Sequence, residues 1–194
     1  MKESIMSFFQ GPVRNKKPLS ICSIHSLLQY ITSDSWLQQT TRQVRMDRNN
    51  PDVFKLKKLT LLPYVTVGGV FSRCCKSGLL VPSGDFVIDI DHLSSAEEAA
   101  RLRDQLAQDV FLKPDLAFIS PSERGIKLFV PYRIDPDIPF EECFRQAVQA
   151  SWTYLEGIYD LQPDPANTDI CRGCLLCHDP EARQYTEPSP KPKR

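Results

Sequence analysis

The chain has 194 residues, of which 24 are basic and 24 acidic, so its formal net charge at neutral pH is zero. A balanced charge gives no overall attraction to nucleic acid, and any polyanion site must be a local basic patch or be bridged by metal ions. A hydrophobic fraction of 41% can fill the core of one compact domain, with or without an N-terminal extension.

Neither a charged-then-apolar leader nor an apolar run of the roughly 20 residues that cross a bilayer is visible in the sequence. The seven cysteines include the adjacent pair Cys74 and Cys75. Without an export signal, these cysteines fit reduced thiols better than a disulfide framework. We therefore expect a cytoplasmic protein.

Residues 1–60 are expected to form an N-terminal extension of strand and helices packed on a core. A short strand is predicted around Phe8 and Phe9, and the apolar spacing of residues 23–31 predicts a helix. A polar helix is predicted over about residues 35–48. This helix carries three arginines at three-residue spacing: Arg42, Arg45 and Arg48. Such a stripe usually faces solvent, and contact with phosphate is the alternative.

The following part of the chain alternates strands with helices. An apolar run broken by Gly68 and Gly69 is expected to pair with the next run, which ends in VIDID. A helix follows, with Ser94 and Glu97 spaced as a capping box. Next come two strands joined by a tight turn, a long amphipathic helix after Pro139, and a last strand and loop.

This order of elements predicts an α+β fold with helices packed on one face of a mostly antiparallel sheet. Residues 61–185 would form the core of the protein. Residues 186–194, which are rich in proline and lysine, are expected to be a linker-like tail.

The stretch VIDID, residues 87–91, places two carboxylates in a strand of buried type. Because strand side chains alternate between faces, Asp89 and Asp91 project together while Ile88 and Ile90 point the other way. Like charges side by side repel and lose hydration unless a cation or hydrogen-bond donors compensate. With Asp169 from a later strand, the pair suits Mg²⁺ or Mn²⁺. The alternative is an acidic strand end at the surface.

The stretch SPSERGIK has groups that a triphosphate needs. Ser120 and Ser122 offer hydroxyls, and the turn through Gly125 can present backbone N–H groups to an anion. Lys127 supplies a point charge one strand away from the aspartates, and Arg172 is a candidate for the same phosphates. The alternative is an ordinary hairpin turn, which commonly contains serine and glycine.

Four stretches of the chain, in this order and spacing, resemble the N-terminal domain of virulence-associated E (VirE-type) proteins of bacterial mobile elements: LLPYVTVGGVF, FVIDIDHL, FISPSERGIKLFV and TDICRGCLLCHDP. That domain is grouped with the archaeo-eukaryotic primase and primase-polymerase superfamily. The resemblance covers roughly residues 5–185. It implies a catalytic core with an RRM-like antiparallel sheet, and an N-terminal helical extension is expected beside it.

Carried onto matching positions, the resemblance implies three metal ligands: Asp89, Asp91 and Asp169. It also implies a motif that faces the nucleotide triphosphate, made of Ser120, Ser122, Gly125 and Lys127, and an arginine after the third motif, Arg172. The chain departs from the pattern at two positions. Glu123 stands where glycine is usual and adds a negative charge beside the expected phosphate site. Lys127 stands where the wider superfamily often has histidine.

The resemblance implies a primase-polymerase-like, metal-dependent nucleotidyltransferase that acts in DNA replication of a mobile element. Its partners would be a nucleoside triphosphate, a DNA or RNA template and a helicase domain or chain, with no role for a membrane. The alternative is a catalytically inactive RRM-like module that binds nucleotide or nucleic acid and works with a separate helicase domain.

The stretch CRGCLLCH contains four candidate zinc ligands: Cys171, Cys174, Cys177 and His178. Structural zinc sites normally draw their ligands from two separated knuckles, and this run is continuous. Free buried thiols are therefore the expectation, and zinc is the alternative.

Overall fold

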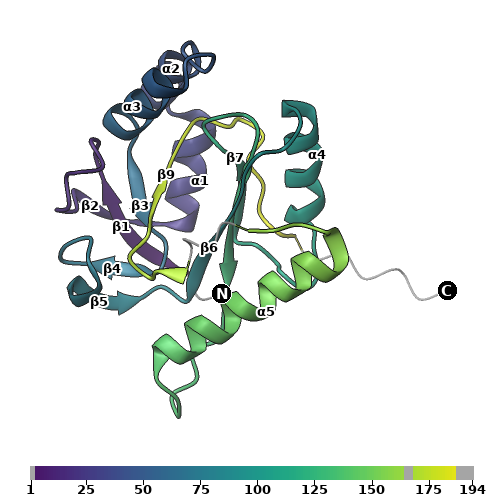
Figure 1. Ribbon diagram of the computed structural model, residues 1–194. Coiled ribbons are helices and arrows are strands. Elements are labelled where there is room, and N and C mark those ends of the chain that lie inside the picture. Colours follow the sequence, from purple (N-terminus) through teal and green to yellow (C-terminus); the bar gives the residue numbers. More distant parts are fainter. Residues whose placement is uncertain (1–2, 164–167, 187–194) are drawn as a thin grey trace.

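The computed structural model describes residues 3–163 and 168–186 (Figure 1). Over these ranges the chain forms five α-helices and nine strands, and the strands lie in three antiparallel sheets. This confirms the predicted α+β class. An RRM-like arrangement of the strands stays a prediction.

The first sheet joins the N-terminal part of the chain to its C-terminal part. In spatial order its four strands are β2 (Ser20–Ser23), β1 (Ile5–Phe9), β3 (Tyr64–Thr66) and β9 (Gly173–Leu175). Strand β1 lies between β2 and β3, so the segment expected as an extension supplies an interior strand. On the other side of β3, Val65 faces Cys174 of β9. This pairing brings the TDICR stretch next to the middle of the chain.

Three helices follow β2 in the chain: α1 (Ile24–Ser33), α2 (Ser35–Arg45) and α3 (Pro51–Leu61). Each begins after a residue whose side chain accepts a hydrogen bond from the first turn, namely Ser23, Asp34 and Asn50. Helix α3 and strand β2 are not predicted from the sequence. Helix α3 has no fully buried residue, so it lacks the apolar periodicity by which a helix is recognised.

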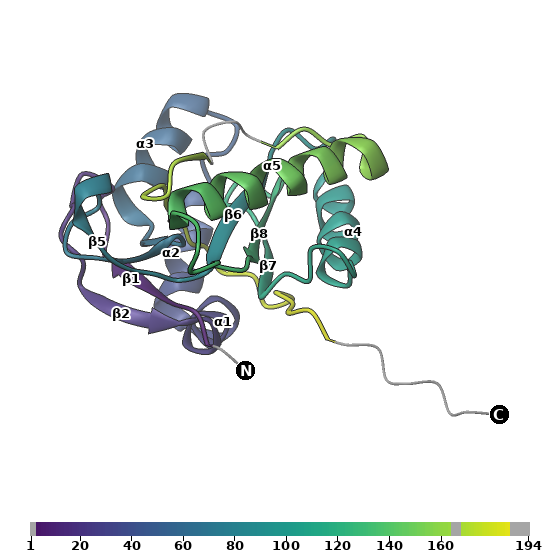
Figure 2. The same cartoon turned by 90° about the horizontal axis from the view of Figure 1, so that it is seen from below.

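The second sheet has the spatial order β6 (Asp85–Ile90), β8 (Ile126–Pro131) and β7 (Leu116–Ile119). Strands β7 and β8 form the predicted hairpin. Helices α4 (Ala96–Ala107) and α5 (Phe140–Tyr159) pack on one face, and Figure 2 shows α5 running across the sheet. The capping residue of α4 is Ser95, which accepts from Glu98 N, so the predicted box is one residue too early.

Both faces of this second sheet are buried. Ile88 and Ile90 lie in the core formed with α4 and α5. Val87 and Phe129 lie in the other core, which includes residues of α1 and of the first sheet. The strand alternation predicted for VIDID is therefore present, and Asp89 shares the face of Val87, toward the first sheet.

The third sheet is a hairpin of β4 (Gly69–Phe71) and β5 (Leu79–Pro82), with a short 3₁₀ turn, η1 (Lys76–Gly78), between them. The sequence predicts that residues 77–91 pair as one strand with the run that contains Gly68 and Gly69. In the structure they are divided near Ser83 into two strands. The first, β5, pairs with β4, and the second, β6, pairs with β8. None of the helices in the described residues is long and apolar enough to cross a bilayer.

Candidate functional site

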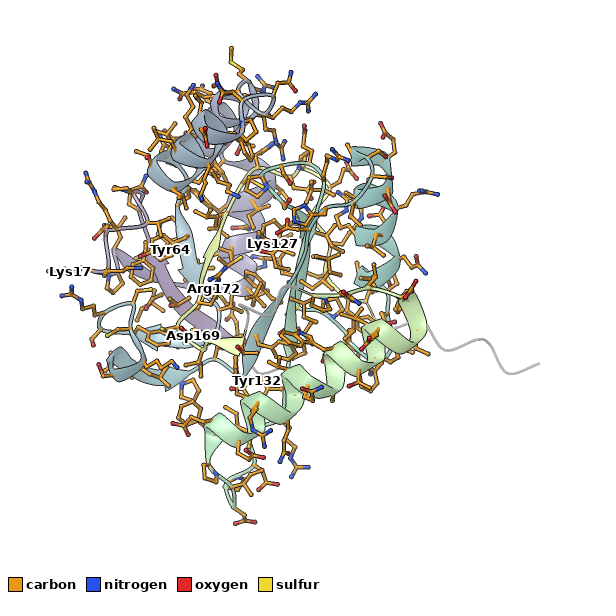
Figure 3. The ribbon with its side chains drawn as sticks, viewed as in Figure 1. Lys17, Tyr64, Lys127, Tyr132, Asp169 and Arg172 are labelled. Atoms are coloured by element: carbon orange, nitrogen blue, oxygen red, sulfur yellow. The ribbon has the colours of Figure 1, made fainter. Side chains whose placement is uncertain are left out.

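A pocket of about 460 Å³ opens between the first and second sheets. Seven of the eight residues singled out from the sequence line it: Asp89, Asp91, Ser120, Ser122, Lys127, Asp169 and Arg172. They come from β6, from the β7–β8 hairpin and from the segment that leads into β9. Figure 3 shows Lys127, Arg172 and Asp169 around the middle of the molecule. The fold thus gathers side chains from three distant stretches.

Asp89 is held by the neighbouring strand. It lies directly opposite Lys127 in the β6–β8 register, and the Lys127 ammonium donates to Asp89 Oδ2. Both side chains are largely buried, at 16% and 9% exposed. Burial by itself would lower the pKa of Lys127, but the Asp89 carboxylate outweighs it and the pKa is raised. The chain itself therefore supplies part of the positive charge that the two aspartates require.

The second oxygen of Asp89 and the neighbouring Asp91 carboxylate lack such compensation. Asp89 Oδ1 is buried and accepts no hydrogen bond within the described structure. Asp91 lies just beyond the end of β6, at the exposed rim of the pocket. Desolvation by neighbouring atoms, and then the charge of Asp89, raises the pKa of Asp91. These two carboxylates fit a divalent cation, which would pair with the buried oxygen and relieve the repulsion.

Asp169 lines the same pocket but does not join this pair. Its Oδ1 accepts from the backbone N–H and the thiol of Cys171, both at 3.3 Å. Throughout the described residues, no group of three or more His, Cys, Asp or Glu side chains is arranged to hold a metal ion. The three-carboxylate set as it stands therefore does not fit one ion.

The turn of SPSERGIK is tightly built against the end of β6. Ser120 N donates to Gly125 O at 2.8 Å, and the hydroxyls of Ser120 and Ser122 are 2.9 Å apart. Gly125 does not line the pocket. A Cβ at this position would lie 2.6 Å from Ile90 O and 2.7 Å from Asp91 Oδ1. Glycine is required here because the turn passes so close to the acidic strand.

Glu123, the departure from the family pattern, turns away from the pocket. Its backbone has φ 62°, a left-handed conformation that favours glycine. Its carboxylate pairs with Arg48 and, at 3.3 Å, with Arg45 of α2. The negative charge expected beside the phosphate site is thus neutralised outside it. Two arginines of the predicted stripe therefore pair with this turn and do not line the pocket: the half-buried Arg45 at the end of α2, and the exposed Arg48 just after it.

The cysteines after Asp169 have packing and hydrogen-bonding roles in the structure. Cys177 Sγ donates to Ile119 O at 3.0 Å, and the buried Cys174 lies beside Lys127. Burial raises the pKa of both thiols to about 12. These thiols are therefore protonated at neutral pH, and with Cys171 and His178 they form no metal-ligand group among the described residues.

Sequence reasoning missed several residues of the pocket wall, among them Lys16, Lys58 and Tyr64. The sequence shows basic runs, NKKP and KLKK, but nothing local tells which lysine of each run faces a site. That choice depends on how the β1–β2 loop and α3 are placed against β3.

The fold and site define an α+β domain with a pocket of mixed charge between two antiparallel sheets. The sequence model of one family, described as BT4734-like, N-terminal domain, matches residues 56–183, and the chain belongs to this family. The match covers all eight predicted site residues and leaves out β1, β2, α1 and α2. No curated protein and no solved structure matches the chain.

Proposed function

We propose that the protein is a metal-dependent nucleotidyltransferase of the primase-polymerase type, which transfers nucleotides from nucleoside triphosphates to a nucleic-acid strand in the replication of a mobile element. One observation carries this proposal: the acidic pair, the serine turn and two basic residues line one pocket although they come from separate parts of the chain. The resemblance to VirE-type N-terminal domains supports it.

In this proposal Asp89 and Asp91 hold Mg²⁺ or Mn²⁺. When bound, such an ion activates the attacking 3′-hydroxyl and stabilises the leaving pyrophosphate. Lys127 holds the Asp89 carboxylate in position through their ion pair. The hydroxyls of Ser120 and Ser122 and the guanidinium of Arg172 contact the phosphates from the pocket wall.

A second candidate is a nucleotide-binding module without chemistry, which serves a separate helicase domain or chain. The position of Asp169 favours it, because this carboxylate bonds to Cys171 and does not join Asp89 and Asp91. For catalysis with two metals, Asp169 would have to leave Cys171 when substrate binds.

The test uses Asp91→Asn, because this change leaves the buried ion pair of Asp89 with Lys127 intact. Nucleotide binding in Mg²⁺ or Mn²⁺ is measured by calorimetry, and primer extension is measured on the same samples. Asp137→Asn, an exposed aspartate outside the pocket, is the control. We expect at least about 100-fold slower extension for Asp91→Asn. The control Asp137→Asn should extend a primer as fast as the wild-type protein.

Each outcome of this test separates the candidates. Metal-dependent binding with extension, both lost in Asp91→Asn, supports the enzyme. Binding without extension in the wild-type protein favours the module. Equal binding and extension in both proteins would remove the acidic pair from the function altogether.

A further inference from the structure

Two lysines in the pocket wall are not used by the site described so far. Lys16 belongs to the β1–β2 loop, and Lys58 to the last turns of α3. Both line the pocket that contains the aspartates and the serine turn. Lys127 is committed to Asp89, but no salt bridge within the described residues involves Lys16 or Lys58.

The loop that carries Lys16 is fastened to the core next to this residue. The carbonyl of Lys16 accepts from Cys74 N at 2.9 Å. The carbonyl of the preceding Asn15 accepts a hydrogen bond from the buried Tyr64 hydroxyl. Lys16 therefore starts from a fixed backbone position beside the pocket, unlike an ordinary surface lysine.

The same loop is bound to α3 beside Lys58. Val13 N donates to Leu59 O at 2.9 Å, and a Cβ on Gly11 would lie 2.8 Å from Thr60 O. Helix and loop are thus packed together, and Val13 and Leu59 line the same pocket as the two lysines.

The charges around the pocket then match a particular class of ligand. The acidic side chains are Asp89 and Asp91 with Asp169, and one of them is neutralised within the protein. A cation bound to the acidic pair would leave Lys16 and Lys58 to face an anion. Several linked phosphates, with their multiple negative charges, suit two lysines from separate elements.

We propose that Lys16 and Lys58 bind the polyphosphate of the incoming nucleotide. This inference rests on the proposed function and adds to it that the N-terminal segment forms part of the substrate site. Lys16 lies outside the residues that the family model matches, whereas Lys58 lies within them.

The experiment measures binding of inorganic tripolyphosphate in Mg²⁺ by calorimetry to the full chain, Lys16→Gln and Lys58→Gln. Two neighbouring lysines provide matched controls. Lys17 is exposed and points away from the molecule in Figure 3, and Lys55 is exposed one turn earlier on α3. We expect about tenfold weaker binding for each pocket variant and less than about twofold for Lys17→Gln and Lys55→Gln. Thermal unfolding checks that all variants fold.

Equal binding by all variants, or no binding of tripolyphosphate by the wild-type chain, would overturn this inference. Normal tripolyphosphate binding together with weakened binding of a primer strand would assign the lysines to nucleic acid and would also overturn it. The proposed function fails separately. Suppose that Asp91→Asn retained full primer extension while the lysine variants no longer bound tripolyphosphate. The lysine site for polyphosphate would then be supported, and the proposed role of the acidic pair would be refuted.

Discussion

Asp89 and Asp91 are two residues apart in the chain, but their surroundings differ. Asp89 is largely buried and paired with Lys127, so its charge is balanced inside the protein. Asp91 is at the rim, and desolvation by neighbouring atoms, followed by the like charge of Asp89, raises its pKa. Water screens part of the repulsion at this exposed position. Of the two carboxylates, Asp91 is therefore the one that can be replaced without leaving a buried charge unpaired.

A first prediction concerns Gly125, whose missing side chain allows the serine turn to approach Asp91. In Gly125→Ala the new Cβ meets backbone, so the turn must shift, and we expect destabilisation by about 1–3 kcal/mol with weaker nucleotide binding. The control is Gly157→Ala in α5, where a Cβ has nothing within 4 Å. That change should stabilise by about 0.5–1 kcal/mol. Urea unfolding measures both, and a neutral Gly125→Ala would contradict the close approach.

A second prediction concerns Asp109, a buried carboxylate at the end of α4. It accepts from Tyr154 and Tyr159 hydroxyls at 2.8 and 2.6 Å and from the backbone of Phe111 and Leu112 at 2.9 and 2.8 Å. Burial by itself would raise the pKa of Asp109, but these hydrogen bonds outweigh it, so the pKa is lowered. The stabilisation is thus present above the ordinary value of 3.8 and is lost as pH falls through the lowered pKa.

Asp109→Asn should therefore lower the free energy of unfolding by about 2 kcal/mol at pH 7. The difference from the wild-type protein should shrink below a pH of about 4. Urea unfolding at several pH values checks this, with the exposed Asp137→Asn as control. A difference that does not change with pH would show that the charge of Asp109 is not what stabilises this corner.

At the scale of elements, helix α2 holds the serine turn from outside the pocket. Arg45 pairs with Glu123 and also donates to Pro121 O at 3.3 Å and Ser120 O at 3.5 Å. Arg48 reaches only Glu123, and its side chain is 57% exposed. The two arginines of one stripe therefore differ in function, because Arg45 contacts the backbone of the turn and Arg48 does not.

We predict that Arg45→Gln lowers the free energy of unfolding by about 1–2 kcal/mol and weakens nucleotide binding several-fold, because the turn loses its support. Arg48→Gln should change stability by less than about 0.5 kcal/mol, as is usual for an exposed ion pair. Arg45→Lys should restore only part of the binding, since an ammonium cannot reproduce the guanidinium geometry. Equal effects of the two glutamine variants would contradict a specific role of Arg45.

At the scale of the whole molecule, the N-terminal segment is part of the core. Strand β1 pairs with β3, and Met6, Ile24 and Leu27 pack in the same buried cluster as Phe129 of the second sheet. A chain reduced to the predicted core would leave β3 without its β1 partner and would expose this cluster to water.

We therefore predict that residues 61–194 alone do not fold cooperatively, whereas the 194-residue chain does. Circular dichroism and urea unfolding of both proteins provide the measurement. A cooperative transition in the shorter chain would mean that the N-terminal segment is a separable extension after all.

Some helices and strands could be predicted from the sequence and others could not, for physical reasons. The β7–β8 hairpin and helix α5 are correctly predicted, because their apolar patterns and turn residues are local signals. Helix α3 is missed since it buries no side chain completely. The pairing of β6 with β8 could not be predicted, because strand pairing depends on which segments meet in the folded chain.

The sequence by itself determined that Asp89 and Asp91 share a face while Ile90 between them points the other way, because alternation along a strand is a property of neighbouring residues. It also determined the class of the fold and the resemblance to a family. Only the tertiary structure decided which basic side chains contact these carboxylates and which contact the serine turn. Lys127 faces Asp89 through the register of two strands, and Arg45 reaches a turn 75 residues away in the chain. Such contacts depend on packing between elements, and local sequence carries no record of them.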